Sequence, residues 1–571
     1  MKMIDMFSHD VIVVGGGLAG MRAAIESSNY ADTAIISRVH PLRSHSGAAQ
    51  GGINAALGNN PAGRDDNWEK HAYDTIKGSD FLADQDAVEV LTKDGPERIF
   101  EMEHWGCPFS RNEDGKIGQR PFGGAGFPRT CYAADKTGHY LLVTAYEQVL
   151  KRKIKVYEEW FVTSLIVGQG AIRGLTAFDI LNSDLEAFRA KAVILATGGA
   201  GWLYGKSTNC MINTGCGMAM GYRVGTALKD MEFVQFHPTA LYPTCILISE
   251  GARGVGGYLI NSQGERFMQR YAPKAMELAP RDIVSRSIQK EIDAGRGIKD
   301  TYVHLELRHL GKQKILTGLP GIRDIAMEFA AIDPIKEPIP VQPAQHYTMG
   351  GVDCNAKCET TIKGLYAAGE CACVSVHGAN RLGGNSLLET VVFGKIGGEN
   401  AGMYAKNLPN NPPTSDDTIQ TAIESEKKHI ARLIEGNGNE DPSIIREELR
   451  NIMVDKVFLF RTEEQLEEAK AKLKELKERQ KHLRPINSCK IYSLDLIRAI
   501  ELEAMLDLGE VIIVSALNRE ESRGSHVRLD FPNRDDVRFL KHTLAYKTSD
   551  GPRIDYSDVK ITRYQPEERK Y

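Results

Sequence analysis

The chain has 571 residues, a length that suits about three to four domains of roughly 150 residues each. Its 71 basic and 75 acidic residues leave a net charge of -4, which argues against a dedicated surface for nucleic acid. The sequence has neither a run of about 20 apolar residues nor an N-terminal signal or transit peptide, so we expect a cytoplasmic chain whose membrane contacts come through a partner.

The first predicted element is a buried strand at residues 11–14 that leads into a glycine-rich turn. Gly15, Gly17 and Gly20 then have the G-x-G-x-x-G spacing that opens a helix after a strand and binds a dinucleotide. The first glycine permits the tight turn, the second lets the backbone approach a pyrophosphate, and the third packs the helix against the strand. The free N–H groups at the start of the helix bind the phosphates.

A second strand is predicted at residues 33–37, and it ends in Ser37 and Arg38. In NAD-binding proteins an acidic residue usually stands near this point, because its carboxylate binds the adenosine ribose. The absence of that residue weakens an assignment to NAD.

His45 lies in the next loop, which reads Arg-Ser-His-Ser-Gly-Ala-Ala-Gln-Gly-Gly over residues 43–52. A histidine in a glycine-rich loop is most simply a hydrogen-bonding residue. This loop, however, resembles the segment of the flavoprotein subunits of succinate dehydrogenases and fumarate reductases in which a histidine is bonded covalently to FAD. In that family the second strand also ends in serine and a basic residue. The resemblance therefore implies FAD, bonded covalently through His45.

The same resemblance implies the other contacts to FAD. They come from the glycine motif, the end of the second strand, the His45 loop and two later segments. Cys216 stands where the family more commonly has aspartate, so its contact would run through its backbone or be absent. The expected set is Gly15, Gly16, Gly17, Leu18, Ala19, Gly20, Ser37, Arg38, His45, Ser46, Gln50, Gly51, Gly52, Cys216, Glu370, Ser386 and Leu387.

Further along the chain, helical patterns are predicted over residues 68–100 and 140–150, and another apolar strand begins at Ala192 and ends in a glycine turn at Gly199. Residues 104–110 and 119–124 are predicted loops, because they are rich in glycine and proline. Both loops continue the family resemblance.

Interconversion of succinate and fumarate, the activity of that family, requires groups that hold two carboxylates and align one carbon with the flavin. Taken singly, each candidate could be a core histidine, a helix cap or a structural clamp. Their segments resemble the active-site motifs of the family in the right order. By that resemblance His237 and Ser249 bind one carboxylate, His346 and Arg381 bind the other, and Phe122 lies beside the substrate.

Arg281 would be the proton donor or acceptor by the same resemblance. A guanidinium keeps its proton up to a pH above about 12, so this role needs a relay to bulk solvent. Glu250 and Arg253 match the members of that relay. At Arg381 the planar fork of arginine suits bidentate carboxylate binding, so lysine should be a poor substitute.

The fold expected from the resemblance is α/β. It has a discontinuous, Rossmann-like FAD-binding domain at residues 1–236 and 347–405, with an inserted α+β capping domain at 237–346. A helical domain at 406–515 and a small C-terminal domain at 516–571 follow. A Pro/Asn-rich stretch at 408–413 predicts a linker at the start of the helical domain.

Two helices are predicted in this C-terminal third. Thr462 and Gln465 form a plausible capping box, followed by apolar residues at helical spacing. Residues 494–508 are predicted to be a second amphipathic helix. The segment 521–536 resembles the family strongly, although its residues alone predict a polar loop.

The ten cysteines are scattered and suit reduced thiols, and none forms a four-ligand metal pattern or a haem-attachment motif. We therefore expect no metal in this chain. The resemblance implies an iron-sulfur subunit, a membrane anchor and quinone as partners, and a location on the cytoplasmic side of the inner membrane. Two alternatives remain open: an L-aspartate oxidase, which has the same fold but binds FAD non-covalently, and a non-catalytic flavin carrier.

Overall fold

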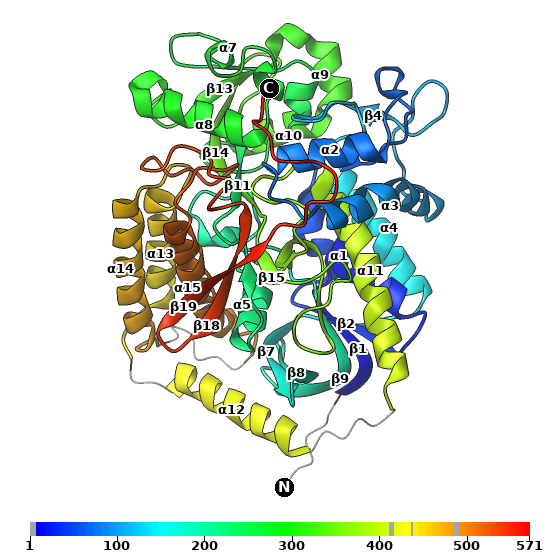
Figure 1. Cartoon of the computed structure of the whole chain (residues 1–571), viewed down its shortest axis with the longest axis vertical. Coiled ribbons are helices and arrows are strands. Elements are labelled where there is room, and N and C mark those ends of the chain that lie inside the picture. Colours follow the sequence, from blue (N-terminus) through cyan, green and yellow to red (C-terminus); the bar gives the residue numbers. More distant parts are fainter. Residues whose placement is uncertain (1–6, 410–415, 436–437, 485–490, 571) are drawn as a thin grey trace.

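The computed structural model describes residues 7–409, 416–435, 438–484 and 491–570. Its largest sheet has the strand order β6-β2-β1-β9-β8-β7, and β16 pairs with β9 (Figure 1). The bounds are Phe7–Val14 for β1, Thr33–Ser37 for β2, Lys155–Glu158 for β6, Trp160–Gly168 for β7, Ala171–Asp179 for β8, Leu185–Leu195 for β9 and Leu365–Ala367 for β16.

Strand β1 lies at the centre of this sheet, between β2 and β9, and runs parallel to both. Its last four residues are buried and its first four are mostly half-buried, so the strand predicted at 11–14 is the buried half of a longer one. Helix α1 (Leu18–Ser27) follows the strand and packs against α11 (Asn385–Asn407). This is the Rossmann-like arrangement that the glycine motif predicts.

Glycines let α1 and α11 approach each other closely. A Cβ atom on Gly398 would lie 2.2 Å from the carbonyl oxygen of Ala23, and one on Gly394 would lie 2.8 Å from that of Ala19. Carbon and oxygen atoms that are not bonded do not come this near, so the two helices pack backbone to backbone. The close packing fixes α11 relative to the turn after β1.

We therefore expect Gly398→Ala to destabilise the protein by about 1–3 kcal/mol, because the added methyl group overpacks a tight interface. The measurement is the thermal unfolding midpoint by scanning calorimetry. Gly318→Ala is the matched control, because Gly318 ends a helix and has open space around its Cβ position. An unchanged midpoint for Gly398→Ala would contradict the packing described.

The region predicted as helical over residues 68–100 is two helices rather than one. Asp80 and Phe81 between them adopt positive φ angles of 56° and 59°, which end the first helix. The helices of this N-terminal part are α2 (Trp68–Gly78), α3 (Gln85–His104), α4 (Thr137–Lys151) and α5 (Cys216–Arg223), and a small sheet joins β3 (Ile53–Asn54), β5 (Thr130–Cys131) and β4 (Gln119–Arg120).

A second sheet, with the order β11-β14-β13-β12, lies at the top of the molecule in Figure 1. Its strands are β11 (Val234–Leu241), β12 (Tyr258–Ile260), β13 (Val303–Glu306) and β14 (Ile339–Thr348), and the helices around it are α6 (Gly251–Gly254), α7 (Met268–Tyr271), α8 (Arg281–Glu291), α9 (Lys312–Gly318) and α10 (Pro320–Ala330). The domain limits expected after residues 236 and 346 fall inside β11 and β14, and they stay a prediction.

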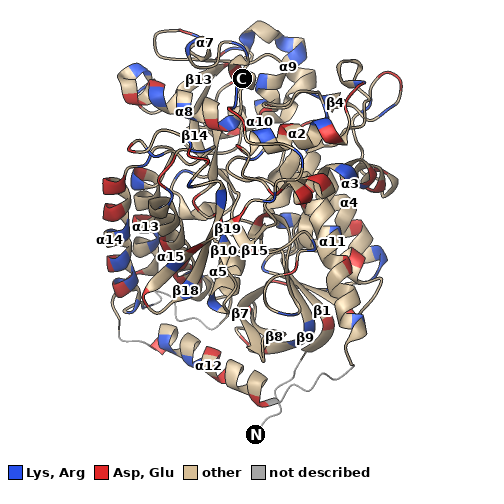
Figure 2. Cartoon of the chain, in the orientation of Figure 1, with Lys and Arg blue, Asp and Glu red and all other residues tan. Residues whose placement is uncertain are grey.

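Four helices follow: α12 (Asp416–Glu435), α13 (Pro442–Lys456), α14 (Glu463–Gln480) and α15 (Leu494–Asn518). Thr462 caps α14 by accepting a hydrogen bond from the N–H of Gln465, as predicted. Figure 2 shows charges of both signs along α14, and the side chains predicted to face the core, Leu466, Ala469, Leu473 and Leu476, are buried. Most of the predicted linker, residues 410–413, lies outside the described residues.

Helix α15 is longer than the amphipathic helix predicted at 494–508 and buries more of its surface. It runs on to Asn518, and 16 of its residues are buried, because it packs against α5, α13 and α14 as well as β19. Its half-buried acidic residues Glu503, Asp507 and Glu510 recur at helical spacing, so the polar face is present but narrow.

The segment 521–536 is also not the polar surface loop that its residues alone predict. Arg519 donates hydrogen bonds to Glu232 and Glu521, at 2.6 and 3.0 Å, and all three side chains are fully buried. Arg519 also donates to Lys541 and Thr543 of β18, at 2.7 and 2.9 Å. It thereby joins the segment to a five-stranded sheet of β17 (Ala372–Cys373), β15 (Gly351–Asp353), β10 (Leu228–Lys229), β18 (Lys541–Thr548) and β19 (Gly551–Asp558).

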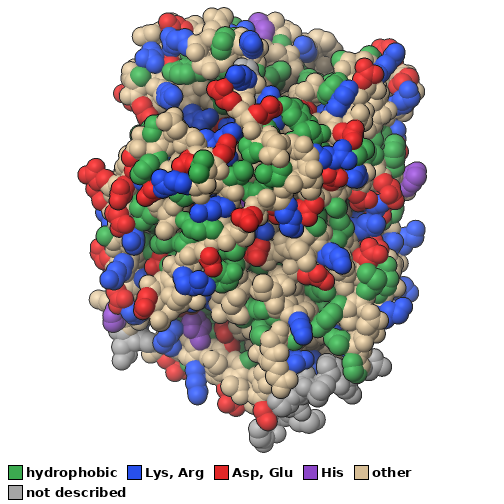
Figure 3. Space-filling view, viewed as in Figure 1, with side chains coloured by type: hydrophobic (Ala, Val, Ile, Leu, Met, Phe, Trp, Pro, Cys, Tyr) green, Lys and Arg blue, Asp and Glu red, His purple; other side chains and the backbone are tan. Residues whose placement is uncertain are grey.

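The surface carries mixed charges. On the face seen in Figure 3, basic and acidic side chains alternate with apolar ones. Within the described ranges, no helix has both the length and the apolar character needed to cross a membrane. The nine cysteines in the described part of the chain form no disulfide, and the tenth, Cys489, lies outside it.

Candidate functional site

A cavity of about 450 Å³ lies between the carboxyl ends of the central strands and the second sheet. The segments that line it are far apart in the sequence, from the turn after β1 to helix α15. Every site residue expected from the sequence lines this cavity except Gly20 and Arg253. The chain thus brings together the two predicted sites, one for a dinucleotide and one for a dicarboxylate.

The first end of the cavity is formed by the glycine turn. Gly15 has a φ of 116°, and a Cβ atom on it would lie 2.3 Å from the carbonyl oxygen of Ala196. Gly20 is absent from the lining because it packs on the turn itself: its Cβ would lie 1.9 Å from the oxygen of Gly15. Gly17 has no side chain to cap helix α1, and the N–H of Leu18 donates to the hydroxyl of Ser46 at 3.2 Å. The positive end of the helix dipole still points at the place where a pyrophosphate would bind.

Arg38, just after β2, contacts an acidic residue of α15 that was not predicted from the sequence. Arg38 forms a two-contact ion pair with Glu501 of α15, one contact being 3.1 Å long, and Glu501 also accepts a hydrogen bond from Thr214 at 2.8 Å. Glu501 is buried and lines the cavity. The carboxylate that β2 lacks is thus present, but it comes from a helix more than 460 residues later. The one sequence signal was an acidic residue within an apolar stretch.

Cys216 begins helix α5 and lines the same end of the cavity. Its sulfur lies 3.3 Å from Thr214 Oγ1, and burial raises the pKa of the thiol to about 12. The side chain is therefore a neutral thiol at pH 7. It cannot replace the charge of the aspartate that the family more commonly has here.

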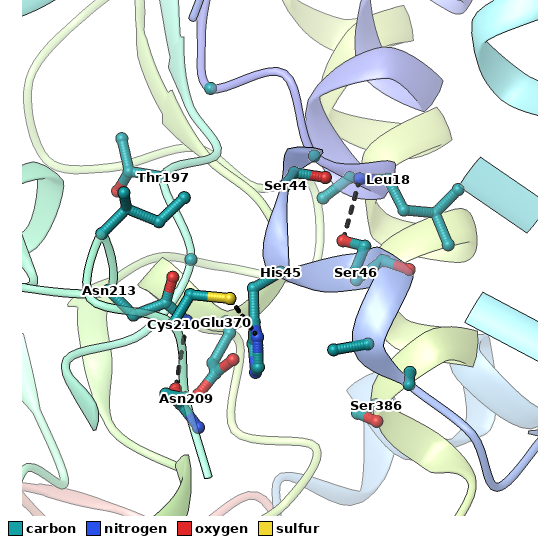
Figure 4. A pocket seen from close by; sticks show the side chains of 18 of the residues that line it. Leu18, Ser44, His45, Ser46, Thr197, Asn209, Cys210, Asn213, Glu370 and Ser386 are labelled. Carbon is teal, nitrogen blue, oxygen red and sulfur yellow. Dashed lines mark hydrogen bonds between the residues drawn. The ribbon is translucent and has the colours of Figure 1, made fainter. Parts of the chain in front are cut away.

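His45 lies further along the cavity, close to Cys210 and Glu370 (Figure 4). Its Nδ1 atom is 3.2 Å from the sulfur of Cys210. Burial lowers the pKa of His45 to about 4, so the imidazole is neutral at pH 7 and keeps a lone pair on one nitrogen. Burial raises the pKa of Glu370 to about 8, and its carboxyl group accepts the N–H of Thr348 at 3.0 Å. Cys210 was not predicted from the sequence.

The N-terminus of α11 also faces the cavity, where Ser386 and Leu387 line it. The helix begins after Gly384, which adopts a left-handed conformation and provides no side-chain cap. The open N–H groups and the positive end of the helix dipole favour a negative charge at this point. A reduced flavin would carry such a charge, so the residues present fit FAD at this end as well as at the glycine turn.

Two histidines stand at the far end of the cavity. His237 on β11 and His346 on β14 lie on paired strands, with ring centroids 5.0 Å apart. Burial, followed by the charge of Arg281, lowers the pKa of both histidines well below the usual value, so both are neutral. The Nδ1 of His237 accepts the N–H of Thr239 at 3.2 Å, which leaves the proton on Nε2. That Nε2 is buried and has no partner in the described structure. It is a donor available to a ligand.

Two arginines lie at this end of the cavity. Among the described side chains, Arg281 has a carboxylate partner and Arg381 has none. Arg281 donates from Nε to Glu250 at 2.9 Å and from Nη1 to Gln235 at 3.1 Å. Arg381 stacks over the ring of Tyr347 at 4.4 Å, and its buried Nε has no hydrogen-bond partner among the described residues. Burial and the nearby Arg281 lower the pKa of Arg381 to about 9. The unbalanced positive charge favours an anion.

Glu250 joins Arg281 to Arg253. Its carboxylate accepts the N–H of Gly123 at 2.6 Å and lies 3.8 Å from an Nη atom of Arg253. Burial alone would raise the pKa of Glu250, but the two arginines outweigh it and hold the pKa below the usual value. Arg253 lies behind the cavity lining and is itself buried, and it donates to the carbonyl oxygen of Glu277.

Ser249 and Phe122 complete the lining near the arginines. The hydroxyl oxygen of Ser249 accepts the N–H of Gly251 at 3.2 Å, so its own proton is available to a ligand. The ring of Phe122 packs directly on Gly51 and Gly383. A Cβ atom added to either glycine would lie only 2.7 Å from the ring. Glycine at both positions lets the aromatic ring wall off one side of the cavity.

These protonation states predict how a dicarboxylate such as malonate binds to the FAD-loaded protein. The affinity should be nearly constant from about pH 6 to 7, because both histidines are already neutral, Glu370 is protonated and Arg381 is charged. It should fall as the pH rises through about 8 and then about 9, by up to about tenfold per unit, because Glu370 gains a negative charge and Arg381 then loses its proton.

The measurement is isothermal titration calorimetry over this pH range. Arg381→Gln is the control and should bind malonate weakly at every pH, without the further fall near pH 9. A titration step centred near pH 6.5 would contradict the account, because it would mean that a histidine must be protonated to bind the anion.

Comparison with known proteins gives a consistent result. A family model described as FAD binding domain matches residues 10–387, and a second, fumarate reductase flavoprotein C-term, matches residues 446–571. The chain is 44% identical to a succinate dehydrogenase flavoprotein subunit of Rickettsia bellii, over 99% of this chain and 98% of the relative. It is 43% identical to a fumarate reductase flavoprotein subunit of Mycobacterium tuberculosis, over 99% of each. A solved quinol fumarate reductase of E. coli superposes with a TM-score of 0.95, at 42% identity and 99% coverage of both chains.

Proposed function

The chain belongs to the family of flavoprotein subunits of succinate dehydrogenase and fumarate reductase, and from this premise we propose how its cavity interconverts succinate and fumarate. It is an FAD-dependent oxidoreductase of the α/β class predicted from the sequence. The full-length identity favours this function over L-aspartate oxidase. The observation that carries the proposal is the pair of buried arginines Arg281 and Arg381, of which Arg281 has a carboxylate partner and Arg381 has none among the described residues.

The substrate lies between the two histidines and the two arginines. One carboxylate accepts hydrogen bonds from the Nε2 of His237 and the hydroxyl of Ser249. The other lies against Arg381, whose planar fork suits bidentate binding, and His346. Phe122 keeps water from this part of the cavity. A dicarboxylate would thereby supply Arg381 with the negative partner that it lacks among the described residues.

Bound FAD supplies the hydride chemistry. The chain would hold its pyrophosphate at the N-terminus of α1 and its flavin between His45 and the N-terminus of α11. Glu370 and Ser386 lie along that end of the cavity. His45 would bond covalently to the flavin, since its imidazole is neutral and one ring nitrogen has a hydrogen-bond partner while the other is left to react.

Arg281 moves the proton at the substrate carbon next to the one that exchanges hydride. Arg281 is the first residue of helix α8, and its guanidinium borders the cavity and donates to Glu250. The carboxylate of Glu250, 2.9 Å from Arg281, can accept a proton from that guanidinium and, once protonated, pass one back to it, so protons can move in either direction. Arg253 continues the relay away from the substrate.

The partners follow from the family. One relative is the flavoprotein subunit of a succinate dehydrogenase, and a similar structure is a quinol fumarate reductase. We propose that this chain likewise passes electrons to an iron-sulfur subunit, and through it to quinone in a membrane anchor. It would then lie at the cytoplasmic face of the inner membrane.

Glu250→Gln tests the proton relay. The amide keeps the size of the side chain but cannot accept the proton of Arg281, so turnover in both directions should fall by about 10²–10⁴-fold. Malonate binding, measured by titration calorimetry, should change far less, because Glu250 does not hold the carboxylates.

The control is Glu328→Gln on the exposed surface of α10, which should turn over as the unmodified protein does. If Glu250→Gln kept more than half of the turnover, the relay would be rejected.

His45→Ser tests the covalent attachment. FAD should remain bound but should leave the polypeptide on denaturation, so the band on a denaturing gel loses its flavin fluorescence. Succinate oxidation should fall more than fumarate reduction, because the covalent bond raises the flavin potential. A fall of 30 mV costs about tenfold in the two-electron equilibrium.

Both directions are measured with artificial electron carriers, with His139→Ser as a control because His139 is exposed. Equal losses in the two directions, or an unmodified protein without a fluorescent band, would count against the proposal.

A further inference from the structure

The thiol of Cys210 lies against the histidine that bonds to the flavin. Its sulfur is 3.2 Å from Nδ1 of His45, and both residues line the cavity (Figure 4). We propose that Cys210 is a positioning residue for flavin attachment, which holds His45 with its proton on Nδ1 and its Nε2 lone pair free to react. This inference rests on the covalent attachment proposed above.

Cys210 is held in place by its own loop. Asn209 on one side donates from its amide to the carbonyl oxygen of His346 at 2.9 Å, and Asn213 on the other donates to Asn209 at 3.0 Å. The N–H of Thr208 donates to the carbonyl oxygen of Gln345 on β14 at 2.9 Å. Hydrogen bonds to residues 345 and 346 thus hold this loop against β14, and they limit how far the backbone of Cys210 can move from His45.

The Cys210 thiol can donate its S–H or accept at its sulfur, and attack by Nε2 requires that the sulfur accept the proton of Nδ1. A neutral imidazole has a single N–H, and the nitrogen that attacks must be the one without it. Cys210 is the one hydrogen-bond partner recorded for the ring of His45 within the described chain, and it lies at Nδ1. A proton on Nδ1 can be donated to the sulfur lone pairs, which leaves Nε2 unprotonated. The imidazole stays neutral because burial lowers its pKa to about 4.

The attachment step also draws on this contact. A bond forms between Nε2 and the carbon of the flavin 8-methyl group, which loses one proton, while the imidazole loses the other. The bonding electrons leave the flavin ring reduced by two electrons, and the ring takes up the two protons. Fumarate, the oxidised substrate of this enzyme, then accepts both electrons and both protons and becomes succinate.

The ring of His45 becomes positive as Nε2 bonds, and its Nδ1–H becomes a stronger donor. A sulfur at 3.2 Å stabilises that proton until it leaves. Without the sulfur the proton has no partner, and attachment should slow by about five- to tenfold, the usual effect of one hydrogen bond.

The experiment follows covalent FAD over time after expression of the full chain is induced. At each time point the protein is purified and denatured, and flavin on the polypeptide is measured by gel fluorescence and by intact mass. Total flavin before denaturation gives the non-covalent binding. Cys210→Ala should bind FAD as before but acquire the covalent bond about five to ten times more slowly. Cys210→Ser should stay within about threefold of the unmodified chain, because its oxygen also accepts the Nδ1 proton.

Cys245→Ala is the matched control, since Cys245 contacts Gln342 and lies outside the cavity lining. Equal rates for Cys210→Ala and the unmodified chain would overturn the role of Cys210 and leave the attachment intact. A serine variant no faster than the alanine variant would overturn it as well. An unmodified chain with no covalent flavin would instead refute the attachment itself.

Discussion

Gln235 connects the two arginines of the site, and this contact ties the two halves of the molecule together. Its side-chain oxygen accepts from Arg281 at 3.1 Å, and its nitrogen donates to the carbonyl oxygen of Arg381 at 2.8 Å. Arg281 begins a helix beside the second sheet, whereas Arg381 precedes the helix that packs on α1. Two guanidinium groups held in a buried space repel each other, and burial makes the repulsion stronger. The site needs an anion to be stable in this form.

The other features of the cavity are consistent with that constraint. The neighbouring histidines are neutral, so in the proposed complex they would bind carboxylates as hydrogen-bond donors and add no further charge. Glu250 neutralises Arg281 but does not reach Arg381 with a hydrogen bond, so one positive charge is left for the substrate. The unpartnered Nε2 of His237 is a second group that could bind an anion, which is consistent with the proposed dicarboxylate substrate.

Local sequence patterns were enough to predict the glycine turn, the strand β2 and the cap of α14. Each depends on residues within a few positions of one another. The roles of His237, His346, Arg281 and Arg381 came from the family resemblance, since a single histidine or arginine has no local pattern that distinguishes a ligand-binding residue from a structural one.

What could not be predicted depends on contacts between distant segments. Glu501 pairs with Arg38, and neither residue carries a signal that it meets the other. The burial of Arg519 with Glu232 and Glu521 could not be predicted from the sequence either, because polar residues usually predict a surface loop. The contact between Cys210 and His45 is of the same kind.

The most direct test is a crystal structure of the FAD-loaded protein with malonate. The account predicts one carboxylate of malonate against the guanidinium of Arg381 and the ring of His346, the other against His237 and Ser249, and the central carbon facing the flavin. Malonate bound elsewhere, or a cavity in which Arg381 pairs with a protein carboxylate instead, would contradict it.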